Sequence, residues 1–307
     1  MNLHHLRIFH TVATTGSFTG AARRLGTSQP AVTIQLRELE RTSGVRLVER
    51  RARRVQLTPA GRALLRVAEK IFGLVDEAEA VLAQAGGAVS GILRISASGT
   101  AGAFLLPPLL TAFRARYPEV RILLETSSQR VLDQVGAFEA DIGVLGAPDG
   151  GVPVAATGDS RLVVHPFVRE PLVLAVRPDH PWARRRTVGV AELAGQPLIL
   201  REPGSTTRRV LETHLEAAGV TPRVVMELGS NEAIKRAVEA GLGIALVGAR
   251  VIARELADRR LRAVRVRGRG FALRFFIVHH ADRAHAPVLR AFLALTRAAG
   301  AGGHPQP

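Results

Sequence analysis

The sequence predicts a multidomain α+β protein with an N-terminal winged helix-turn-helix, a long linker helix and a C-terminal, two-lobed α/β domain. Three observations predict this organisation. Two short amphipathic helical patterns are joined by a tight turn at Gly26-Thr27. An apolar repeat with a period of about 3.5 residues follows between residues 59 and 86. Beyond residue 91, strand patterns alternate with helical patterns, which is typical of βαβ units on a mostly parallel sheet.

The N-terminal segment begins with a helix from Leu3 to Thr15. Its predicted buried residues are Leu6, Phe9, Val12 and Ala13. Ser17 is the predicted N-cap of the second helix, which ends at Gly26 because glycine tolerates the backbone of a sharp turn. Ser28 caps the third helix, whose buried stripe consists of Val32, Leu36 and Leu39. Helices joined in this way form a helix-turn-helix, whose last helix can enter a major groove.

A short hairpin is predicted after the third helix, between Val45 and Thr58. Val55 and Leu57 alternate with a polar residue, as in a strand, and arginines cluster at the turn. Such a hairpin is a wing that places arginines beside a DNA backbone or in a minor groove. The turn itself contains Arg51-Ala52.

The motifs S-F-T-x-A-A-x-x-L-G, S-Q-P-A-V-T and L-x-x-L-E lie in this order between Ser17 and Glu40. With the agreement that extends from Leu3 to Gly61, they resemble the DNA-binding segment of LysR-type transcriptional regulators. The alternative is a plain helical hairpin whose polar face is only solvated. The resemblance implies double-stranded DNA as a partner, contacted through Ser28, Gln29, Pro30, Thr33, Ile34 and Arg37 of the third helix and Arg50, Arg53 and Arg54 of the wing. Members of this family often have glycine in the wing turn, where this chain has Arg51-Ala52.

Positive charge is concentrated in the same segment. Residues 1–60 contain ten arginines against Glu38, Glu40 and Glu49, a net charge of +7 out of +16 for the chain. The other 247 residues therefore carry +9, a charge density about threefold lower. Genome composition can produce an arginine bias by itself, but the location of the charge fits neutralisation of DNA phosphates.

A linker helix is predicted from residue 59 to 86, because Thr58-Pro59 combines an N-cap with proline at the first helical position. Its apolar repeat consists of Leu64, Ala68, Ile71, Val75, Ala78 and Leu82. A coiled-coil seam is one interpretation, and a helix packed on its own domain is the other. The resemblance favours the seam, since the family dimerises through this helix, and it implies a homodimer or homotetramer. Residues 87–91 form the predicted hinge.

The domain from residue 92 to 298 contains the predicted strands and helices of two lobes. Lobe I is expected at about 92–165 and 267–298, lobe II at about 166–266, and a disordered tail at 299–307. The predicted strands are 92–97, 120–125, 141–145, 171–176, 197–200, 223–227, 244–247 and 271–278. The segments GILRISASGTAGAFLLPPLLTAFRARYPEV and LREPGSTTR resemble the effector domain of LysR-type regulators, which is built like a periplasmic binding protein. Thr206 and Ser127-Ser128 depart from residues that are frequent in relatives, which leaves the identity of the ligand open.

Hydroxyl and amide side chains stand at several predicted helix starts in this domain. The candidate effector-binding residues are Ser98, Thr100, Ser128, Gln129, Ser205, Thr206, Thr207 and Asn231. Each can lie beside unpaired N–H groups of a helix terminus, where anions bind. The alternative is that each serine is simply an N-cap. We expect a small anionic ligand in a cleft between the lobes, with Arg201 or Arg208 as a candidate countercharge.

Other function classes are less well supported by the sequence. The absence of cysteine excludes disulfides and thiolate chemistry. His279, His280 and His285 suggest no metal site, because adjacent strand residues point to opposite faces. We therefore expect no cofactor, no metal, no enzymatic activity and no membrane partner for a cytoplasmic transcriptional regulator, with RNA polymerase as a further candidate partner. The alternatives are a cytoplasmic solute-binding protein or enzyme on the same α/β lobes, and a structural nucleoid protein.

Overall fold

The structure is a computed structural model that describes residues 2–51, 54–85, 89–127, 129–153 and 161–301. The chain divides into two compact units. The N-terminal unit contains residues 1–79 with 137–139, and the C-terminal unit contains residues 80–136 and 140–307. The linker helix begins in the first unit and ends in the second.

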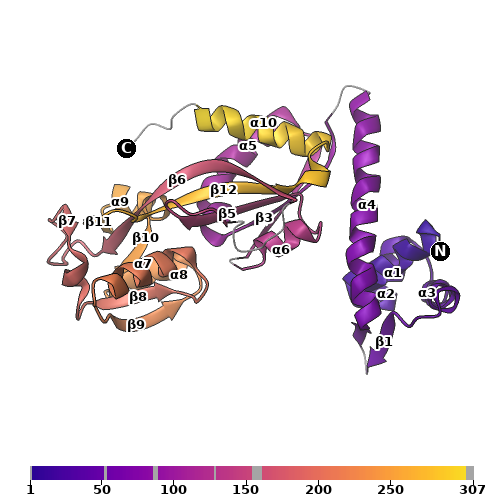
Figure 1. Cartoon of the computed structure of the whole chain (residues 1–307), viewed down its shortest axis with the longest axis horizontal. Helices are drawn as coiled ribbons and strands as arrows, with labels where there is room; N and C mark the ends of the chain where they lie inside the picture. Colours follow the sequence, from indigo (N-terminus) through magenta and orange to yellow (C-terminus); the bar gives the residue numbers. More distant parts are fainter. Residues whose placement is uncertain (1, 52–53, 86–88, 128, 154–160, 302–307) are drawn as a thin grey trace. The chain divides into compact units, whose positions relative to one another are not determined.

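The N-terminal unit contains the predicted helix-turn-helix and wing (Figure 1). Its elements are α1 (Leu3–Thr15), α2 (Phe18–Leu25), α3 (Gln29–Ser43), β1 (Val48–Arg51), β2 (Arg54–Leu57) and the first part of α4 (Pro59–Ala85). The Ser17 hydroxyl accepts a hydrogen bond from the Gly20 N–H at 3.2 Å, and the Ser28 hydroxyl accepts one from Ala31 at 3.3 Å. Gly26 has a φ of 65°, so the tight turn uses the left-handed conformation that glycine permits. The caps and the turn predicted from the sequence are confirmed.

The core of the N-terminal unit explains one error of the sequence analysis. Ala68 of α4 is fully buried in the cluster formed by α1, α2 and α3, and Leu64 and Ile71 pack against the same cluster. These three residues were predicted to face a partner helix, but they belong to the core of their own unit. The helix-turn-helix already covers this face of α4, so the apolar repeat in the first half of the helix belongs to the core of the N-terminal unit. The exposed large apolar side chains on α4 are instead Val67, Leu74 and Leu82.

The C-terminal unit contains an eight-stranded mixed sheet among its described residues, in the order β4-β3-β5-β12-β6-β11-β7 with β10 beside β6. A separate parallel pair is formed by β8 and β9. The strands are β3 (Gly91–Ala97), β4 (Val120–Thr126), β5 (Ile142–Pro148), β6 (Leu162–Val176), β7 (Thr187–Val188), β8 (Pro197–Arg201), β9 (Arg223–Leu228), β10 (Ala245–Gly248), β11 (Arg262–Val266) and β12 (Ala272–His280).

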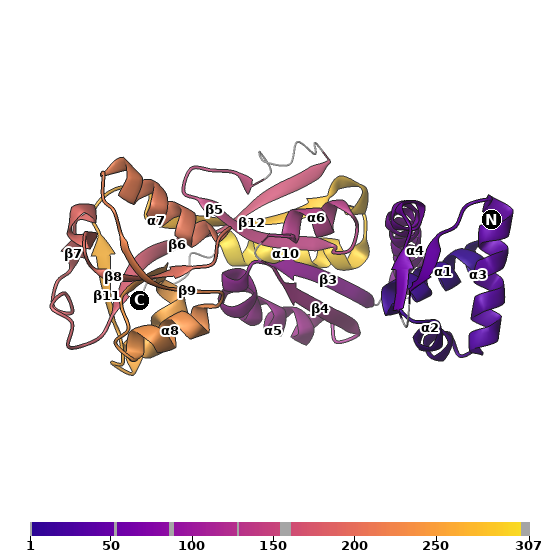
Figure 2. The same cartoon turned by 90° about the horizontal axis from the view of Figure 1, so that it is seen from below.

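The prediction of a mostly parallel sheet is wrong, because two long strands connect the lobes in opposite directions. β3, β4 and β5 are parallel, but β12 is antiparallel to both β5 and β6. β6 pairs with β12 up to Pro171 and with β10 and β11 from Leu172 onward. The chain therefore enters lobe II along β6 and returns along β12, which lie side by side in Figures 1 and 2.

Helices cover both faces of the lobe I sheet (Figure 1). α5 (Leu106–Arg116) and α10 (Pro287–Ala301) pack on one face, where the rings of Phe113 and Phe292 meet edge to face with centroids 5.3 Å apart. α6 (Val131–Gly136) packs on the other face. Lobe II contains α7 (Thr206–Ala217), α8 (Asn231–Glu239) and α9 (Ala253–Ala257). A π-helical turn, η1 (Ala101–Leu105), precedes α5, and short 3₁₀ turns η3 (Val190–Leu193), η4 (Ala249–Ile252) and η5 (Ala281–Arg283) complete the unit.

Two further expectations need correction. Residues 299–301 belong to α10, which ends at Ala301, three residues beyond the predicted end of the domain, and 302–307 lie outside the described residues. No strand was predicted between residues 247 and 271, but β11 lies there, with Val264 and Val266 buried. Residues 86–88 of the predicted linker end and hinge lie outside the described residues, and Gly91 already starts β3.

We expect Gly61→Ala to destabilise the N-terminal unit. A Cβ atom at Gly61 would lie 2.0 Å from the Leu47 carbonyl oxygen, at the place where α4 begins against the start of the wing. Overpacking of this kind costs about 1–3 kcal/mol. Thermal unfolding of the full chain followed by circular dichroism measures the effect. Gly20→Ala is the control, because its Cβ would be 3.4 Å from the nearest atom and alanine favours a helix by about 1 kcal/mol. Equal stability of the two variants would contradict the expectation.

Candidate functional site

The exposed face of α3 is the first candidate site. Val32, Leu36 and Leu39 are buried against α1 and α2, as predicted. The opposite face exposes Gln29, Pro30, Ile34 and Arg37, with Thr33 half-buried beside them. Ile34 is 66% exposed and lies near the centre of this face. The structure therefore gathers the predicted α3 residues on one accessible surface.

Local hydrogen bonds fix this surface. The Gln29 side-chain amide donates to the Thr33 hydroxyl at 3.0 Å, and that hydroxyl donates to the Gln29 carbonyl at 3.0 Å. On the inner side of the helix, the Glu40 carboxylate accepts from the N–H groups of Leu47 and Val48 at 2.7 and 3.1 Å. The start of β1 is thereby tied to α3, so the wing has a defined position beside the exposed face.

The structure describes the backbone of two of the three arginines predicted for the wing. Arg50 lies in β1 and Arg54 in β2, in the antiparallel pair that connects Arg51 with Arg54, whereas Arg53 lies outside the described residues. A groove of about 640 Å³ runs between α2, α3 and β1, and Arg37 and Arg46 line it. The sequence analysis did not select Arg46. Arg46 could have been selected from the sequence, because it lies at the start of the predicted hairpin and within the basic segment.

The second candidate site is a cleft between the lobes of the C-terminal unit. Ser98, Thr100, Ser205, Thr206 and Thr207 line one small chamber of about 30 Å³. Asn231 lines an adjacent chamber of about 340 Å³, together with Phe104 and Ser127. Gly99 and Arg201 line both chambers. Six of the eight predicted effector residues thus meet in one place.

The two remaining predicted residues differ from these six. Gln129 lines neither chamber, and its amide donates to the Pro203 carbonyl at 3.2 Å, so it joins the two lobes at the rim. Ser128 lies outside the described residues.

The helix termini at the cleft are not equivalent. Ser230 caps α8, since its hydroxyl accepts from the Ala233 N–H at 3.1 Å. Ser205 occupies the same position on α7 but makes no capping hydrogen bond. The first-turn N–H groups of α7, for which a helix has no internal acceptors, therefore begin at the small chamber without a side-chain cap. In the described part of the chain, the buried hydroxyl oxygen of Ser98 has no hydrogen-bond partner either. The N-cap interpretation holds for Ser230 and fails for Ser205.

Hydrogen bonds across the cleft hold the lobes together. The Asn231 amide donates to the Thr100 hydroxyl oxygen at 3.0 Å. The Thr206 hydroxyl donates to the Gly146 carbonyl at 3.1 Å. With the contact between Gln129 and Pro203, three side chains close the cleft in this structure.

Arg201 is the charged group of the cleft. Its side chain is 6% exposed and stands at the end of β8, and its guanidinium donates to the Glu202 carboxylate at 2.7 and 2.9 Å and to the Asn231 amide oxygen at 2.7 Å. Arg208 instead forms ion pairs with Glu212 and Glu227 at 2.6 and 3.0 Å and lines neither chamber. Of the two countercharges considered from the sequence, Arg201 is the one at the site.

Other candidate groups lie elsewhere. His279 and His280 are buried, and the Nε2 atoms of His279 and His165 are 3.1 Å apart. Among the described residues, no group of three or more His, Asp or Glu side chains is arranged to hold a metal ion. Within that same part of the chain, none of the helices has the length and apolar character needed to cross a membrane.

Comparisons with known proteins cover both units. Residues 3–62 match the bacterial regulatory helix-turn-helix protein, lysR family, and residues 86–301 match the LysR substrate binding domain. The RuBisCO operon transcriptional regulator of Allochromatium vinosum is 34% identical over 95% of this chain and 94% of that protein. Full-length CbnR in complex with its target DNA is 26% identical, with a TM-score of 0.70 over 97% of this chain and 99% of that one. The regulatory domain of CcmR from Synechocystis PCC6803, in complex with 2-PG, is 27% identical, with a TM-score of 0.61 over 69% of this chain and 98% of that domain.

Proposed function

The chain belongs to the LysR family of transcriptional regulators, and on this premise we propose that it reads DNA with α3 and responds to a small anion bound between its lobes. It works as a cytoplasmic homodimer or homotetramer and acts by binding, without catalysis. The observation that carries the anion proposal is the uncapped N-terminus of α7, which begins at a chamber that also contains the unpartnered Ser98 hydroxyl and Arg201.

The chemistry of the chamber favours a carboxylate or a phosphate. A helix N-terminus carries a partial positive charge, and its free N–H groups donate to anions. Thr100 has its oxygen engaged by Asn231, so the hydroxyl proton remains available for a ligand. The Arg201 guanidinium, whose charge is partly balanced by the Glu202 carboxylate, adds a charged donor, and hydrogen bonds from charged donors to an anion are stronger than neutral ones. The CcmR regulatory domain was solved with 2-PG, which is a small anion, and this similarity supports the proposal.

The exposed face of α3 fits the edges of base pairs. Gln29 has an amide that can pair with adenine, and the exposed Ile34 offers an apolar surface for a thymine methyl group. Arg37, Arg50, Arg53 and Arg54 supply phosphate or minor-groove contacts. CbnR, which is similar over nearly its full length, was solved on its target DNA. A RuBisCO operon promoter is the first DNA to test, because the relative from Allochromatium vinosum regulates such an operon.

The exposed apolar residues of α4 fit a helix-to-helix seam. Val67, Leu74 and Leu82 are 50%, 53% and 74% exposed, and Ala78 is exposed between them. A contiguous apolar stripe on a soluble helix marks an interaction surface. A second copy of α4 covers this stripe in the proposed dimer, which connects two recognition helices for two half-sites.

We expect Gln29→Ala to relax sequence specificity by about 1–3 kcal/mol at one base pair, because the amide no longer pairs with a base edge. Fluorescence anisotropy on the preferred duplex and on its single-base variants measures the discrimination. Thr42→Ala is the control, since this residue lies at the exposed end of α3 and its hydroxyl donates only to backbone carbonyls. If Gln29→Ala keeps the full discrimination at every position, Gln29 does not read a base.

We expect Leu74→Glu to dissociate the dimer while leaving the N-terminal unit folded, because a carboxylate at the seam would be buried without a partner. Sedimentation velocity reports the oligomeric state, and operator binding should weaken together with it. Ile71→Glu is the matched comparison. Ile71 packs against the core of the unit, so Ile71→Glu should lower the melting temperature of the unit itself, which Leu74→Glu should not do. A Leu74→Glu protein that sediments like the parent would place the seam elsewhere.

We expect Thr100→Val to weaken the response to an anionic ligand by about 1–2 kcal/mol, because it keeps the shape of the side chain and removes the hydroxyl that accepts from Asn231 and can donate to an anion. Thermal shift of the full chain across a series of small anions that includes 2-PG measures binding. DNA binding without ligand should stay close to that of the parent. Thr111→Val is the control, since this exposed threonine on α5 bonds only the Pro107 carbonyl. The anion site is elsewhere if an anion stabilises the parent and Thr100→Val equally.

A further inference from the structure

Two arginine-rich segments about eighty residues apart in sequence lie side by side at one edge of the sheet in lobe II. β7 is the edge strand and pairs in parallel with β11. The Arg265 N–H donates to the Arg186 carbonyl at 3.2 Å, and the Arg267 N–H donates to the Val188 carbonyl at 2.7 Å. The two strands form one end of lobe II in Figures 1 and 2. We call the exposed arginines of these segments the β7–β11 strip, which consists of Arg184, Arg185, Arg186, Arg265, Arg267 and Arg269.

The strip lies on the solvent side of a well-packed edge. Val264 and Val266 point into the core and alternate with the exposed Arg265. On the neighbouring strand, Val188 is fully buried and Thr187 is half-buried, while Arg184, Arg185 and Arg186 before them are exposed. The packing of the valines therefore fixes the backbone that displays the arginines.

Charge compensation within the strip is small. Glu192 accepts from Arg185 at 2.5 Å and from Arg267 at 3.4 Å, and it also accepts from the Gly189 N–H. Arg184, Arg186, Arg265 and Arg269 pair with no carboxylate among the described residues. One edge of lobe II thus carries six exposed guanidinium groups against one carboxylate in the described part of the chain.

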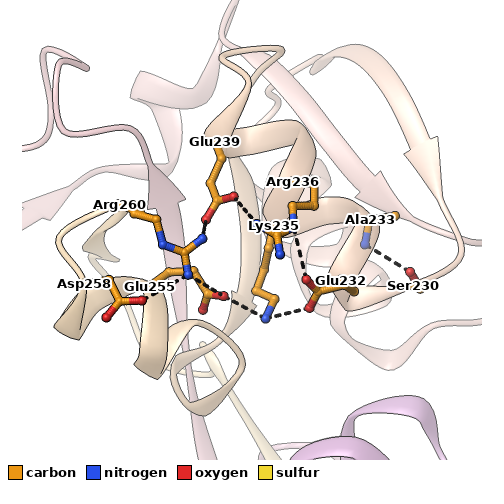
Figure 3. A network of polar contacts seen from close by, with 9 residues as sticks. All are labelled: Ser230, Glu232, Ala233, Lys235, Arg236, Glu239, Glu255, Asp258 and Arg260. Atoms are coloured by element: carbon orange, nitrogen blue, oxygen red, sulfur yellow. Dashed lines mark hydrogen bonds and ion pairs between the residues drawn. The ribbon is translucent and has the colours of Figure 1, made fainter.

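Elsewhere in the same lobe, the charges around the buried Lys235 and Glu255 are paired (Figure 3). Around α8 and α9, Lys235 pairs with Glu232 and Glu255, and Arg260 pairs with Glu239, Glu255 and Asp258. Arg236 completes this network through Glu232 and Glu239, so three cations face four carboxylates. Carboxylates therefore pair with each cation of this network, whereas along the strip Glu192 is the one carboxylate that does so among the described residues.

We propose that the β7–β11 strip binds the backbone of DNA outside the bases that α3 reads. A duplex presents one phosphate charge about every 1.7 Å along its axis, so a row of guanidinium groups meets several phosphates at once. Guanidinium also pairs with phosphate through two parallel hydrogen bonds, which makes arginine the suitable residue for this contact.

The strip and the DNA-binding α3 belong to one chain, in which α4 connects the two units. α4 has 27 residues, which corresponds to about 40 Å of helix. Once α3 holds a duplex, the C-terminal unit stays tethered within a comparable distance of it. Tethering converts a weak second contact into an intramolecular one, at an effective concentration on the order of millimolar. The strip can then be bound to phosphates for much of the time even if each contact is weak.

The test compares the full-length parent with the variant Arg184→Ser, Arg186→Ser, Arg265→Ser and Arg269→Ser combined. Affinity is measured over a series of salt concentrations on two duplexes with the same central site, one ending at the half-sites and one with extended flanks. On the long duplex the variant should bind roughly ten- to a hundred-fold more weakly, and its salt slope should fall by about 3 to 4, since each phosphate contact contributes about 0.9. On the short duplex, variant and parent should be alike.

A matched variant controls for net charge. Arg114→Ser, Arg121→Ser, Arg223→Ser and Arg290→Ser combined removes four other exposed arginines of the C-terminal unit. It should keep most of the parent's affinity and salt slope on the long duplex, and sedimentation verifies that both variants assemble like the parent. Three results would overturn the proposal. The strip variant could have the parent's affinity on both duplexes, it could lose the same factor of affinity on both, or the control variant could lose as much affinity on the long duplex as the strip variant does.

Discussion

The antiparallel pair of β6 and β12 is the constraint on which the geometry of the C-terminal unit depends. Both lobes are built on these two strands, so any site between the lobes inherits its position from them. Glu170 lies in β6 just before the strand changes partners, and it is fully buried. Burial raises the pKa of this carboxyl, whereas hydrogen bonds from the Arg250 N–H and guanidinium at 2.8 and 2.9 Å lower it. Removal of Arg250 would leave this buried carboxyl without either hydrogen bond, so the pair ties η4 to β6 beside the place where the strand changes partners.

The small chamber of the cleft combines a helix start that has no side-chain cap with a buried hydroxyl that has no hydrogen-bond partner among the described residues. α1, α2, α3 and α8 each have a side-chain cap, but α7 does not, and its start faces the buried Ser98 hydroxyl. Folding alone gives no reason to leave donors unpaired in one small chamber. Local rules are broken mainly at functional sites, where a ligand supplies the missing partner.

Local signals in the sequence predicted the helix-turn-helix, the wing and most of the strands, because caps, glycine turns and apolar periods depend on neighbouring residues. Ser17, Gly26 and Ser28 are examples. The errors arose where tertiary structure decides. The period on α4 does not tell whether Ile71 meets its own unit or a partner, and strand patterns carry no direction, so the antiparallel course of β12 was missed. β11 was hidden because exposed arginines alternate with only two buried valines. Arg201 and Arg208 were both candidates for the countercharge. The fold shows that Arg201 lines the cleft, whereas Arg208 pairs with Glu212 away from it.

The closed cleft also constrains how a ligand can act. The small chamber of about 30 Å³ has room for about one or two water molecules, which is less than a carboxylate or phosphate group requires. An anion at the start of α7 must therefore displace contacts that now cross the cleft, such as the Thr206 hydroxyl on the Gly146 carbonyl and the Asn231 amide on Thr100. A ligand shifts a conformational equilibrium only by its difference in affinity for the two states. Because the same side chains hold the ligand-free lobes together and contact the ligand, exchange of these hydrogen bonds is the physical source of that difference.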